Sequence, residues 1–221
     1  MVPLSYNYRN LRVRWKTTLM TASGFTLVVA ALVVMLAFIN GIESACATTG
    51  EPENVILLSK GNNDEVLSQM ERSLVAQVEN SKGVALDAAG QPIASRELFM
   101  VVHHRPEKSS EFCFLQVRGV LPAAFRVHSQ LHLIEGRAFR PGQSEVMIGK
   151  GVQRENHLQV GDAIEMGRKR WKIAGVFASG GAAFESELWC DLNELASQFR
   201  REGFYSTVIL RAANPAEAEE L

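Results

Sequence analysis

The chain has 221 residues, a formal net charge of −1 and 21% charged residues, which is enough chain for one ordinary domain behind a membrane segment. Phosphate binding needs a concentrated basic face, so this near-neutral balance argues against nucleic acid as a partner. The sequence contains no Walker A loop ending in Gly-Lys-Ser or Gly-Lys-Thr, so we expect no ATP hydrolysis by the chain itself.

An uncharged, apolar stretch near the N-terminus predicts a transmembrane helix over residues 17–41. No charged residue occurs between Lys16 and Glu43. A helix of about 24 residues is about 36 Å long, enough to cross a hydrocarbon core of about 30 Å. A cleaved signal peptide shares the basic flank, and Ala45-Cys46-Ala47 fits its cleavage pattern, but its apolar region has only about 7–15 residues. We therefore expect a membrane-spanning helix.

The charges beside this stretch predict its orientation. Residues 1–16 contain no acidic residue, whereas the first charged residue after the stretch is Glu43. The basic residues of this lead-in are Arg9, Arg12, Arg14 and Lys16. By the positive-inside bias, the N-terminus is cytoplasmic and residues 42–221 are exported. This predicts an inner (cytoplasmic) membrane protein whose main domain is periplasmic or otherwise extracytoplasmic.

A row of small residues runs along the predicted helix. Ala22, Thr26 and Ala30 recur at every fourth position. Such rows let another helix approach closely, so we expect this row to pack against a neighbouring membrane helix.

The start of the exported region predicts a strand followed by a helix. Residues 55–59 form a short apolar run typical of a buried strand. Asn63 is a suitable N-cap for a helix over residues 64–80. Along that helix, hydrophobic residues repeat at Val66, Met70, Leu74 and Val78. We expect this stripe to cover a sheet.

The rest of the chain predicts mostly strands. The expected strands are 96–103, 111–120, 145–149, 163–166, 171–177, 187–192 and 206–211. The first two form a hairpin, and a short helix with Val152 and Leu158 follows the third. Asn214-Pro215 begins a last helix. We therefore predict an α+β fold.

The histidines predict no metal site. His103 and His104, neighbours on a strand, face opposite sides, and we expect both at the surface. His128 and His132 have the spacing of a helical metal pair, but the residues around them alternate as in an extended segment, and no third ligand is in register.

Two cysteines, Cys113 and Cys190, fall in predicted strands. A disulfide between them and two free buried thiols both fit the sequence.

Several motifs resemble, in order, those of ABC transporter permeases of the MacB/FtsX-like type. They are Asn54-Val55-Ile56-Leu57, Gly119-Val120, Glu135-Gly136-Arg137-Ala138-Phe139, Gly149, Leu158-Gln159-Val160-Gly161-Asp162 and Ile173-Ala174-Gly175-Val176-Phe177. The resemblance implies one N-terminal transmembrane helix followed by a MacB-like periplasmic core domain. That domain would have a porter-like α/β part, about residues 52–90 and 204–221, and a β-rich part, about residues 91–203.

The same resemblance implies structural roles for five motif residues. Gly136, Gly161 and Gly175 would lie at turns or close approaches of the backbone. Arg137 and Asp162 would be polar anchors of loops.

The function implied is that of a permease subunit, or its N-terminal portion. A separate ATP-binding subunit would drive motion of the exported domain for export or for lipoprotein and lipid handling. A second permease copy or paralogue, an adaptor protein and membrane lipids are the other partners implied. The family's remaining membrane helices are absent from the sequence, so we expect a truncated chain.

The alternative is a membrane-anchored binding or sensor module without an ATPase partner. The sequence contains no nucleophile-elbow or HExxH motif, so we expect no enzyme, and no cofactor is implied.

Overall fold

The computed structural model describes residues 9, 12–49, 51–104 and 113–218; of these, the side chains of 44–49 and 215 are not described. The predicted turn at 105–110 and the start of the predicted strand 111–120 lie outside the described residues. The chain divides into two units, Met1–Ala47 and Thr48–Leu221. We describe each unit by itself.

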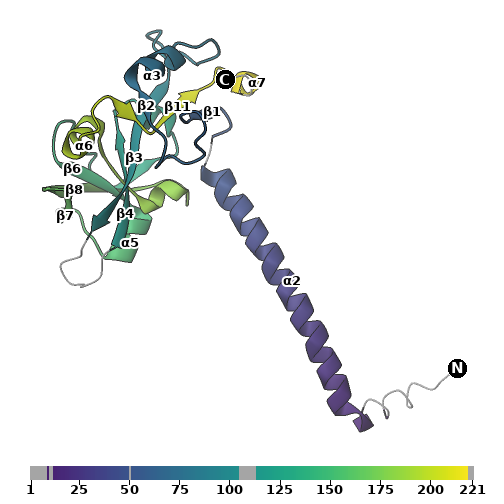
Figure 1. The fold of residues 1–221 in the computed structure, drawn as a ribbon. Helices are drawn as coiled ribbons and strands as arrows, with labels where there is room; N and C mark the ends of the chain where they lie inside the picture. Colours follow the sequence, from purple (N-terminus) through teal and green to yellow (C-terminus); the bar gives the residue numbers. More distant parts are fainter. Residues whose placement is uncertain (1–8, 10–11, 50, 105–112, 219–221) are drawn as a thin grey trace. The chain divides into compact units, whose positions relative to one another are not determined.

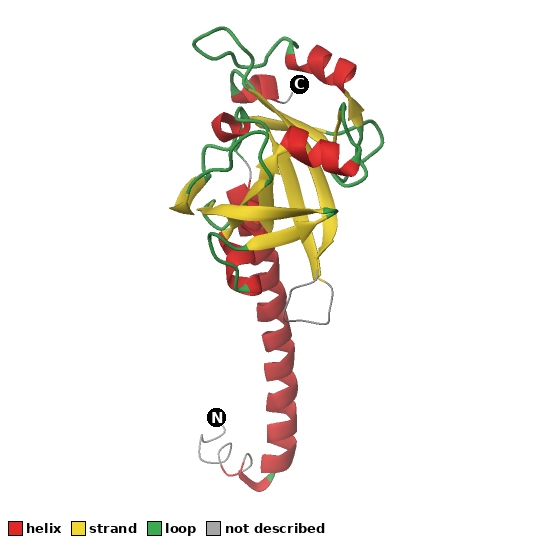
Figure 2. Cartoon of the chain, turned by 90° about the vertical axis from the view of Figure 1, so that its left-hand side faces the viewer, coloured by secondary structure: helices red, strands yellow, loops and turns green. Residues whose placement is uncertain are grey.

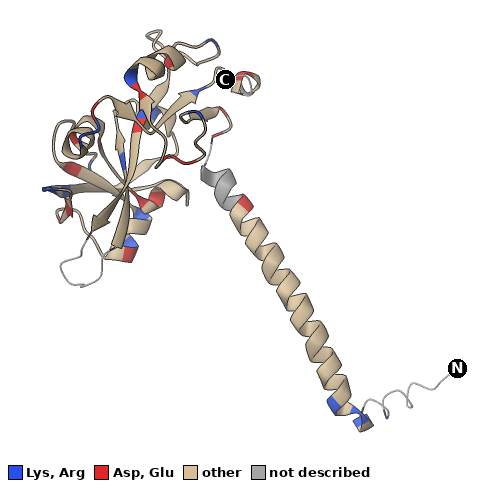
Figure 3. Ribbon diagram, in the orientation of Figure 1, with Lys and Arg blue, Asp and Glu red and all other residues tan. Residues whose placement is uncertain are grey.

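The first unit consists mainly of one long helix, α2 (Trp15–Thr49, 35 residues; Figure 1). Its segment Trp15–Glu43 is long enough to cross a membrane, and an 18-residue window within it has a mean hydropathy of 2.5 and no buried residue. Figure 3 shows no charge along it between Lys16 and Glu43. The predicted helix over 17–41 is thus confirmed and extended, because no proline interrupts the residues that follow.

Hydroxyl groups near the start of α2 are bonded within the helix. Thr21 Oγ1 donates to the Thr17 carbonyl at 3.0 Å, and Thr26 Oγ1 donates to the Ala22 carbonyl at 2.8 Å. Such bonds to the preceding turn leave no unpaired hydroxyl donor, so these threonines are compatible with an apolar surrounding.

A nine-stranded sheet dominates the second unit (Figures 1 and 2). Its strands are β1 (Asn54–Leu57), β3 (Ala94–His104), β4 (Cys113–Val120), β5 (His132–Gly136), β6 (Glu145–Gly149), β7 (Ala163–Met166), β8 (Lys169–Ala178), β9 (Glu187–Asp191) and β11 (Thr207–Arg211). Their order is β1-β11-β3-β4-β9-β6-β8-β5, and β7 pairs with β8. The pairs β4–β9 and β6–β8 are parallel, and the other pairs are antiparallel.

Short helices and a second sheet complete this unit. The helices are α3 (Arg72–Glu79), α4 (Ala124–Val127), α5 (Lys150–Asn156), a 3-10 helix (Ala183–Ser186), α6 (Leu192–Phe199) and α7 (Pro215–Ala218). The second sheet pairs β2 (Met70–Glu71) with β10 (Phe204–Tyr205). Asn214 caps α7, because its Oδ1 accepts a hydrogen bond from the Glu217 N–H at 3.0 Å, as expected.

Most predicted strands are confirmed. The expected strands 145–149 and 163–166 have the bounds of β6 and β7, and β8 contains the expected strand 171–177. The expected strand 187–192 ends one residue early, because Asp191 caps α6 by accepting from the Glu194 N–H at 2.9 Å. α6 itself was not predicted.

The predicted helix over 64–80 is wrong in its first half, because α3 begins only at Arg72. Side chains fix the preceding segment in another conformation. Ser68 Oγ accepts from the Ser59 N–H at 2.9 Å, and Ser59 Oγ accepts from the Gln69 N–H at 3.1 Å. Serine side chains that bond to the backbone in this way compete with helix formation.

The predicted stripe of that helix consequently does not form. Met70 is buried on β2, whereas Val66 and Leu74 are exposed. Val75 of α3 is fully buried.

The expected two-part division of the domain stays a prediction. β1 and β11, the first and last strands of the second unit in sequence, pair with one another in register Asn54↔Arg211. β11 also pairs with β3, so the expected parts share one continuous sheet.

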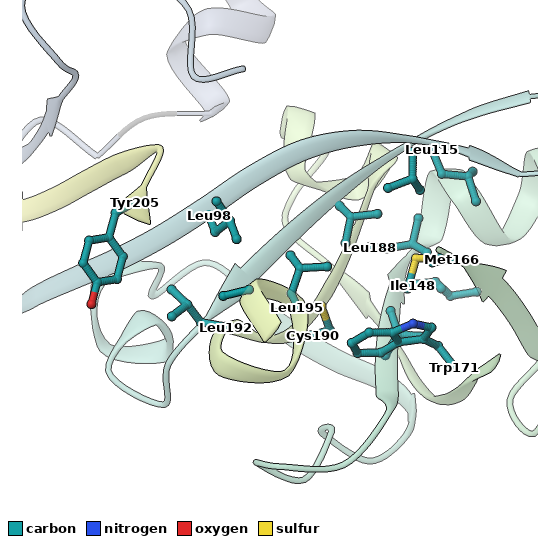
Figure 4. Close-up of a cluster of buried hydrophobic side chains, with 14 of the residues drawn as sticks. Leu98, Leu115, Ile148, Met166, Trp171, Leu188, Cys190, Leu192, Leu195 and Tyr205 are labelled. Atoms are coloured by element: carbon teal, nitrogen blue, oxygen red, sulfur yellow. The ribbon is translucent and has the colours of Figure 1, made fainter. Parts of the chain in front are cut away.

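Hydrophobic side chains form two clusters on opposite faces of this sheet. Neighbouring residues of β6, β8 and β9 alternate between them, as Ile148 and Met147 do. The larger cluster gathers side chains from β3, β4, β6 and β9 with Leu192 and Leu195 of α6 (Figure 4). The smaller cluster lies around Trp189.

One of the two histidines expected at the surface is covered. His103 is exposed as predicted, but His104 is only 9% exposed, because it points to the opposite, covered face.

Cys113 and Cys190 are free thiols. Cys190 pairs with Gly119 across β4 and β9. Six residues of strand separate Gly119 from Cys113, about 20 Å. A disulfide needs Cα atoms within about 7 Å, so the fold does not allow this pairing.

Candidate functional site

A group of charged side chains is buried on the face of the sheet that carries Trp189. We call it the Arg118 network. Its members are Glu65, Ser95, Glu97, Arg118, His128, Glu187 and Trp189. They come from β3, β4, β9, the turn before β2 and the residue after α4.

Arg118 lies at the centre and uses all five of its N–H donors. Its Nε and Nη2 bind the two oxygens of Glu187 at 2.7 and 2.9 Å. Its Nη1 and Nη2 bind Glu65 at 3.0 and 2.7 Å, and Nη1 also binds Glu97 at 2.7 Å. The rings of Phe99 and Phe184 lie 4.8 and 5.4 Å from Arg118 Cζ. The guanidinium therefore joins three segments of the chain in one fixed geometry.

Further donors hold the two most buried carboxylates. Glu97 Oε1 lies 2.8 Å from His128 Nε2 and accepts from Ser95 Oγ at 2.7 Å. Glu187 accepts from Trp189 Nε1 at 2.9 Å. These partners compensate for the removal of both carboxylates from water.

Charge within the network is not balanced. Burial lowers the pKa of Arg118, but Glu187 and Glu97 outweigh burial and hold it well above its usual range. Three carboxylates face one guanidinium, so the network carries two excess negative charges with neutral His128 and one with an imidazolium. Removing Arg118 would therefore leave buried charge without a partner.

Glu97 makes stability depend on pH. Burial raises its pKa, but Arg118 and His128 lower it more, and the folded-state pKa is about 2. An unfolded glutamate titrates near about 4.3. Stability from this lowered pKa is fully present above about pH 4.3 and is lost as the pH falls towards 2. We expect the melting temperature of the full chain in detergent to fall as the pH is lowered from about 4.3 towards 2. The variant Glu97→Gln should be less stable at neutral pH, and its melting temperature should fall less steeply as the pH is lowered. Equal slopes of melting temperature against pH in the two proteins would contradict this.

A second polar group lies where the chain enters the domain. We call it the junction cluster. Its members are Glu51, Asn54, Val127, Ser129 and Arg211. Glu51 lies two residues after the end of α2 in sequence, and Arg211 ends β11.

Arg211 is the centre of the junction cluster. It pairs with Glu51, reaches Asn54 Oδ1 at 3.3 Å, and donates to the Val127 carbonyl at 2.9 Å. Asn54 Nδ2 donates to the same carbonyl at 3.0 Å, and Ser129 Oγ donates to Glu51. The first and last strands of the domain are thus tied together and to the end of α4.

Three consecutive residues at the C-terminal end of α4 connect the two groups. Val127 and Ser129 belong to the junction cluster, and His128 between them contacts Glu97 of the Arg118 network. The polar contacts from Glu51 to Glu65 are therefore joined through the backbone of residues 127–129.

Three of the five motif residues lie together at β5 and β8. Gly136 (φ +69°) pairs with Gly175, and a Cβ on Gly175 would overlap the Arg137 carbonyl. Arg137 forms a bidentate ion pair with Glu145, with N–O distances of 2.7 and 2.5 Å. The backbones of β5 and β8 can approach this closely only without a side chain on Gly175.

The other two motif residues form a separate turn before β7. The Gly161 N–H (φ +100°) donates to the Ile173 carbonyl at 2.9 Å. Asp162 accepts from the Gln159 N–H at 2.8 Å. The structural roles assigned to all five residues stay predictions.

The remaining predicted residues lie on α2 or precede it in the sequence. Arg9, Arg12, Arg14 and Lys16 are exposed, as are Ala22, Thr26 and Ala30. Among the described residues, no three His, Cys, Asp or Glu side chains are placed to hold a metal ion.

Sequence reasoning missed the Arg118 network and the junction cluster. His128 was considered only as a metal ligand, and Glu97, Arg118 and Glu187 were read as ordinary strand residues. One signal was available: Arg118 stands among the apolar residues Val117, Gly119 and Val120 at the end of a predicted strand.

Comparisons with known proteins give a consistent result. The family described as the MacB-like periplasmic core domain matches residues 18–221. The crystal structure of the extracellular domain of the noncanonic ABC-type transporter YknZ from Gram-positive bacteria has a TM-score of 0.53 at 16% identity, covering 76% of this chain and 86% of that chain.

The periplasmic region of MacB from Actinobacillus actinomycetemcomitans has a TM-score of 0.57 at 12% identity, covering 79% of this chain and 82% of that chain. No curated protein sequence matches the chain. At these identities the structural likeness shows the fold alone. That fold is the mixed helix and sheet arrangement expected behind one apolar N-terminal helix.

Proposed function

Because the chain belongs to the family of the MacB-like periplasmic core domain, we propose that it is the permease subunit of an ABC transporter, or the N-terminal portion of one. A separate subunit hydrolyses ATP, and this chain turns the resulting shift into motion of its extracytoplasmic domain. This motion of the domain serves export or the handling of lipoproteins and lipids. The observation that carries the proposal is the single family match that includes both the apolar helix and the domain.

In this proposal α2 spans the inner membrane with its N-terminus in the cytoplasm. The exposed Arg12, Arg14 and Lys16 support this orientation. Lys16 Nζ lies 5.9 Å from the ring centroid of Trp15, a pairing suited to the membrane interface. The row Ala22, Thr26 and Ala30 faces a membrane helix of a partner, either a second permease copy or a paralogue.

The junction cluster is proposed to couple α2 to the domain. A shift of α2 reaches the domain first at Glu51, which Arg211 ties to the last strand. The residues after α4 then carry the shift to Glu97 and Arg118. Coupling between distant sites needs contiguous contacts of this kind, together with two arrangements of the connected elements.

Copurification tests the proposed partnership. We expect the tagged full-length protein, isolated from its native membrane in mild detergent, to carry an ATP-binding subunit in near-stoichiometric amount. Filling the small-residue row by Ala22→Leu with Ala30→Leu should lower the recovery of membrane partners, because the close approach is blocked. Ala31→Leu, on another face of α2, should not.

The control is an unrelated single-span protein with the same tag. An adaptor protein and bound lipids are further proposed partners, and nucleic acid is not. If no ATP-binding subunit is recovered while the chain is folded and in the membrane, the chain is the anchored binding or sensor module instead.

A further inference from the structure

A cleft outside both polar groups opens beside β3. Its volume is about 190 Å³. Its lining consists of residues 66, 68 and 69 of the turn before β2, residues 98–101 of β3, and residues 201 and 204–206 around β10. In Figure 4, Leu98 and Tyr205 mark the end of the core cluster next to this cleft.

Arg201 in this cleft has no charged partner among the residues that the structure describes. The other half-buried or buried arginines of the domain, Arg96, Arg118 and Arg211, each lie against a carboxylate. Arg201 is half-buried, and within the described part of the chain no side chain bonds to its guanidinium. Its backbone is fixed, because its N–H donates to the Ala196 carbonyl at 2.8 Å. A half-buried arginine on a fixed backbone, with no carboxylate of the described residues beside it, is suited to a carboxylate from outside.

The rim of the cleft is apolar and uncovered. Val66, Val101 and Phe204 are 43%, 42% and 40% exposed. Three large apolar side chains around one small cleft form the kind of patch that binds a partner.

The edge of β3 at this cleft has free main-chain groups. β11 pairs with β3 only as far as Glu97, and Ser206 Oγ then donates to the Phe99 carbonyl at 3.0 Å. By the alternation of an antiparallel strand, the N–H and C=O of Val101 point to the same edge. Among the strands that the structure describes, none pairs with them there. A main chain in extended conformation can use both groups.

We propose that this cleft binds an extended segment of a partner protein that presents an apolar side chain next to an Asp or Glu. The apolar side chain fills the cleft, the carboxylate pairs with Arg201, and the segment's main chain bonds to Val101. Pockets for drug-sized ligands have about 300–1,000 Å³, so this volume suits a single side chain. The inference is independent of the proposed coupling to ATP hydrolysis.

Selection from a random peptide library tests the proposal. Full-length protein in nanodiscs is used to select binders from random dodecapeptides displayed on phage. We expect enrichment of sequences with an apolar residue beside Asp or Glu. The enriched peptides, made synthetically, should bind Arg201→Gln and Val66→Asp at least about tenfold more weakly in fluorescence anisotropy. Arg201→Lys, which keeps the charge, should retain most of the binding.

The matched control is Arg168→Gln in the β7–β8 turn, because Arg168 is exposed and has no side-chain partner among the described residues. It should bind as the unmodified protein does. Enriched peptides that lack acidic residues would overturn the proposal. So would peptides that bind Arg201→Gln as tightly as the unmodified protein. Arg201-dependent binding of fluorescent oleate with no peptide enrichment assigns the cleft to an anionic lipid and also overturns it.

Discussion

Replacing Arg118 by methionine should lower the free energy of unfolding of the extracytoplasmic domain by about 3–5 kcal/mol. The substitution keeps most of the side-chain volume but leaves Glu97 and Glu187 buried without a cation. Breaking a buried pair by removing one partner has a cost of this size, because the remaining charge stays desolvated. A domain has only about 5–15 kcal/mol of stability in total, so the variant should be markedly less stable.

Chemical denaturation of the full chain in detergent, followed by the fluorescence of the buried Trp171 and Trp189, measures this effect. The matched control is Arg137→Met, which breaks the exposed ion pair with Glu145 and should change stability far less, because water screens that pair. Unpaired buried carboxylates have raised pKa values, so the deficit of Arg118→Met should shrink as the pH is lowered. A deficit equal to that of the control would show that the network is not a stabilising unit.

The second large effect is expected at the junction cluster. Arg211→Met removes the donor shared by Glu51, Asn54 and the Val127 carbonyl. The loss of these partly buried bonds should cost about 1–3 kcal/mol. If α2 drives the domain through this cluster, the variant should still bind the ATP-binding subunit but lose most of the ATP-dependent motion of the domain. Arg126→Met, which breaks an exposed pair with Asp87 and leaves α4 in place, is the control.

Local patterns made the strands predictable. Apolar runs bounded by glycines, such as 145–149 and 163–166, predicted β6 and β7 at their observed bounds. The prediction of a helix over 64–80 was wrong in its first half. The apolar residues there repeat every four positions, but the side-chain hydrogen bonds of Ser59 and Ser68 and the pairing of β2 with β10 favour another conformation. Tertiary contacts of this kind override a local periodicity.

The two polar groups could not be predicted for a related reason. Arg118 meets Glu65 and Glu187 across 53 and 69 residues of chain, and Arg211 meets Glu51 across 160. No spacing in the sequence marks such partners. The motif glycines Gly136 and Gly175 were recognisable only through the family resemblance, and their contact follows from the pairing of β5 with β8.

The most direct test follows hydrogen exchange in the full-length protein, purified with its ATP-binding subunit in nanodiscs. Exchange at residues 51–57 and 124–131 is compared with and without a non-hydrolysable ATP analogue. The account predicts that the nucleotide changes exchange in both segments, and that Arg211→Met removes the change at 124–131 while Arg126→Met keeps it. Identical exchange with and without nucleotide in both segments, in a complex that hydrolyses ATP, would contradict it.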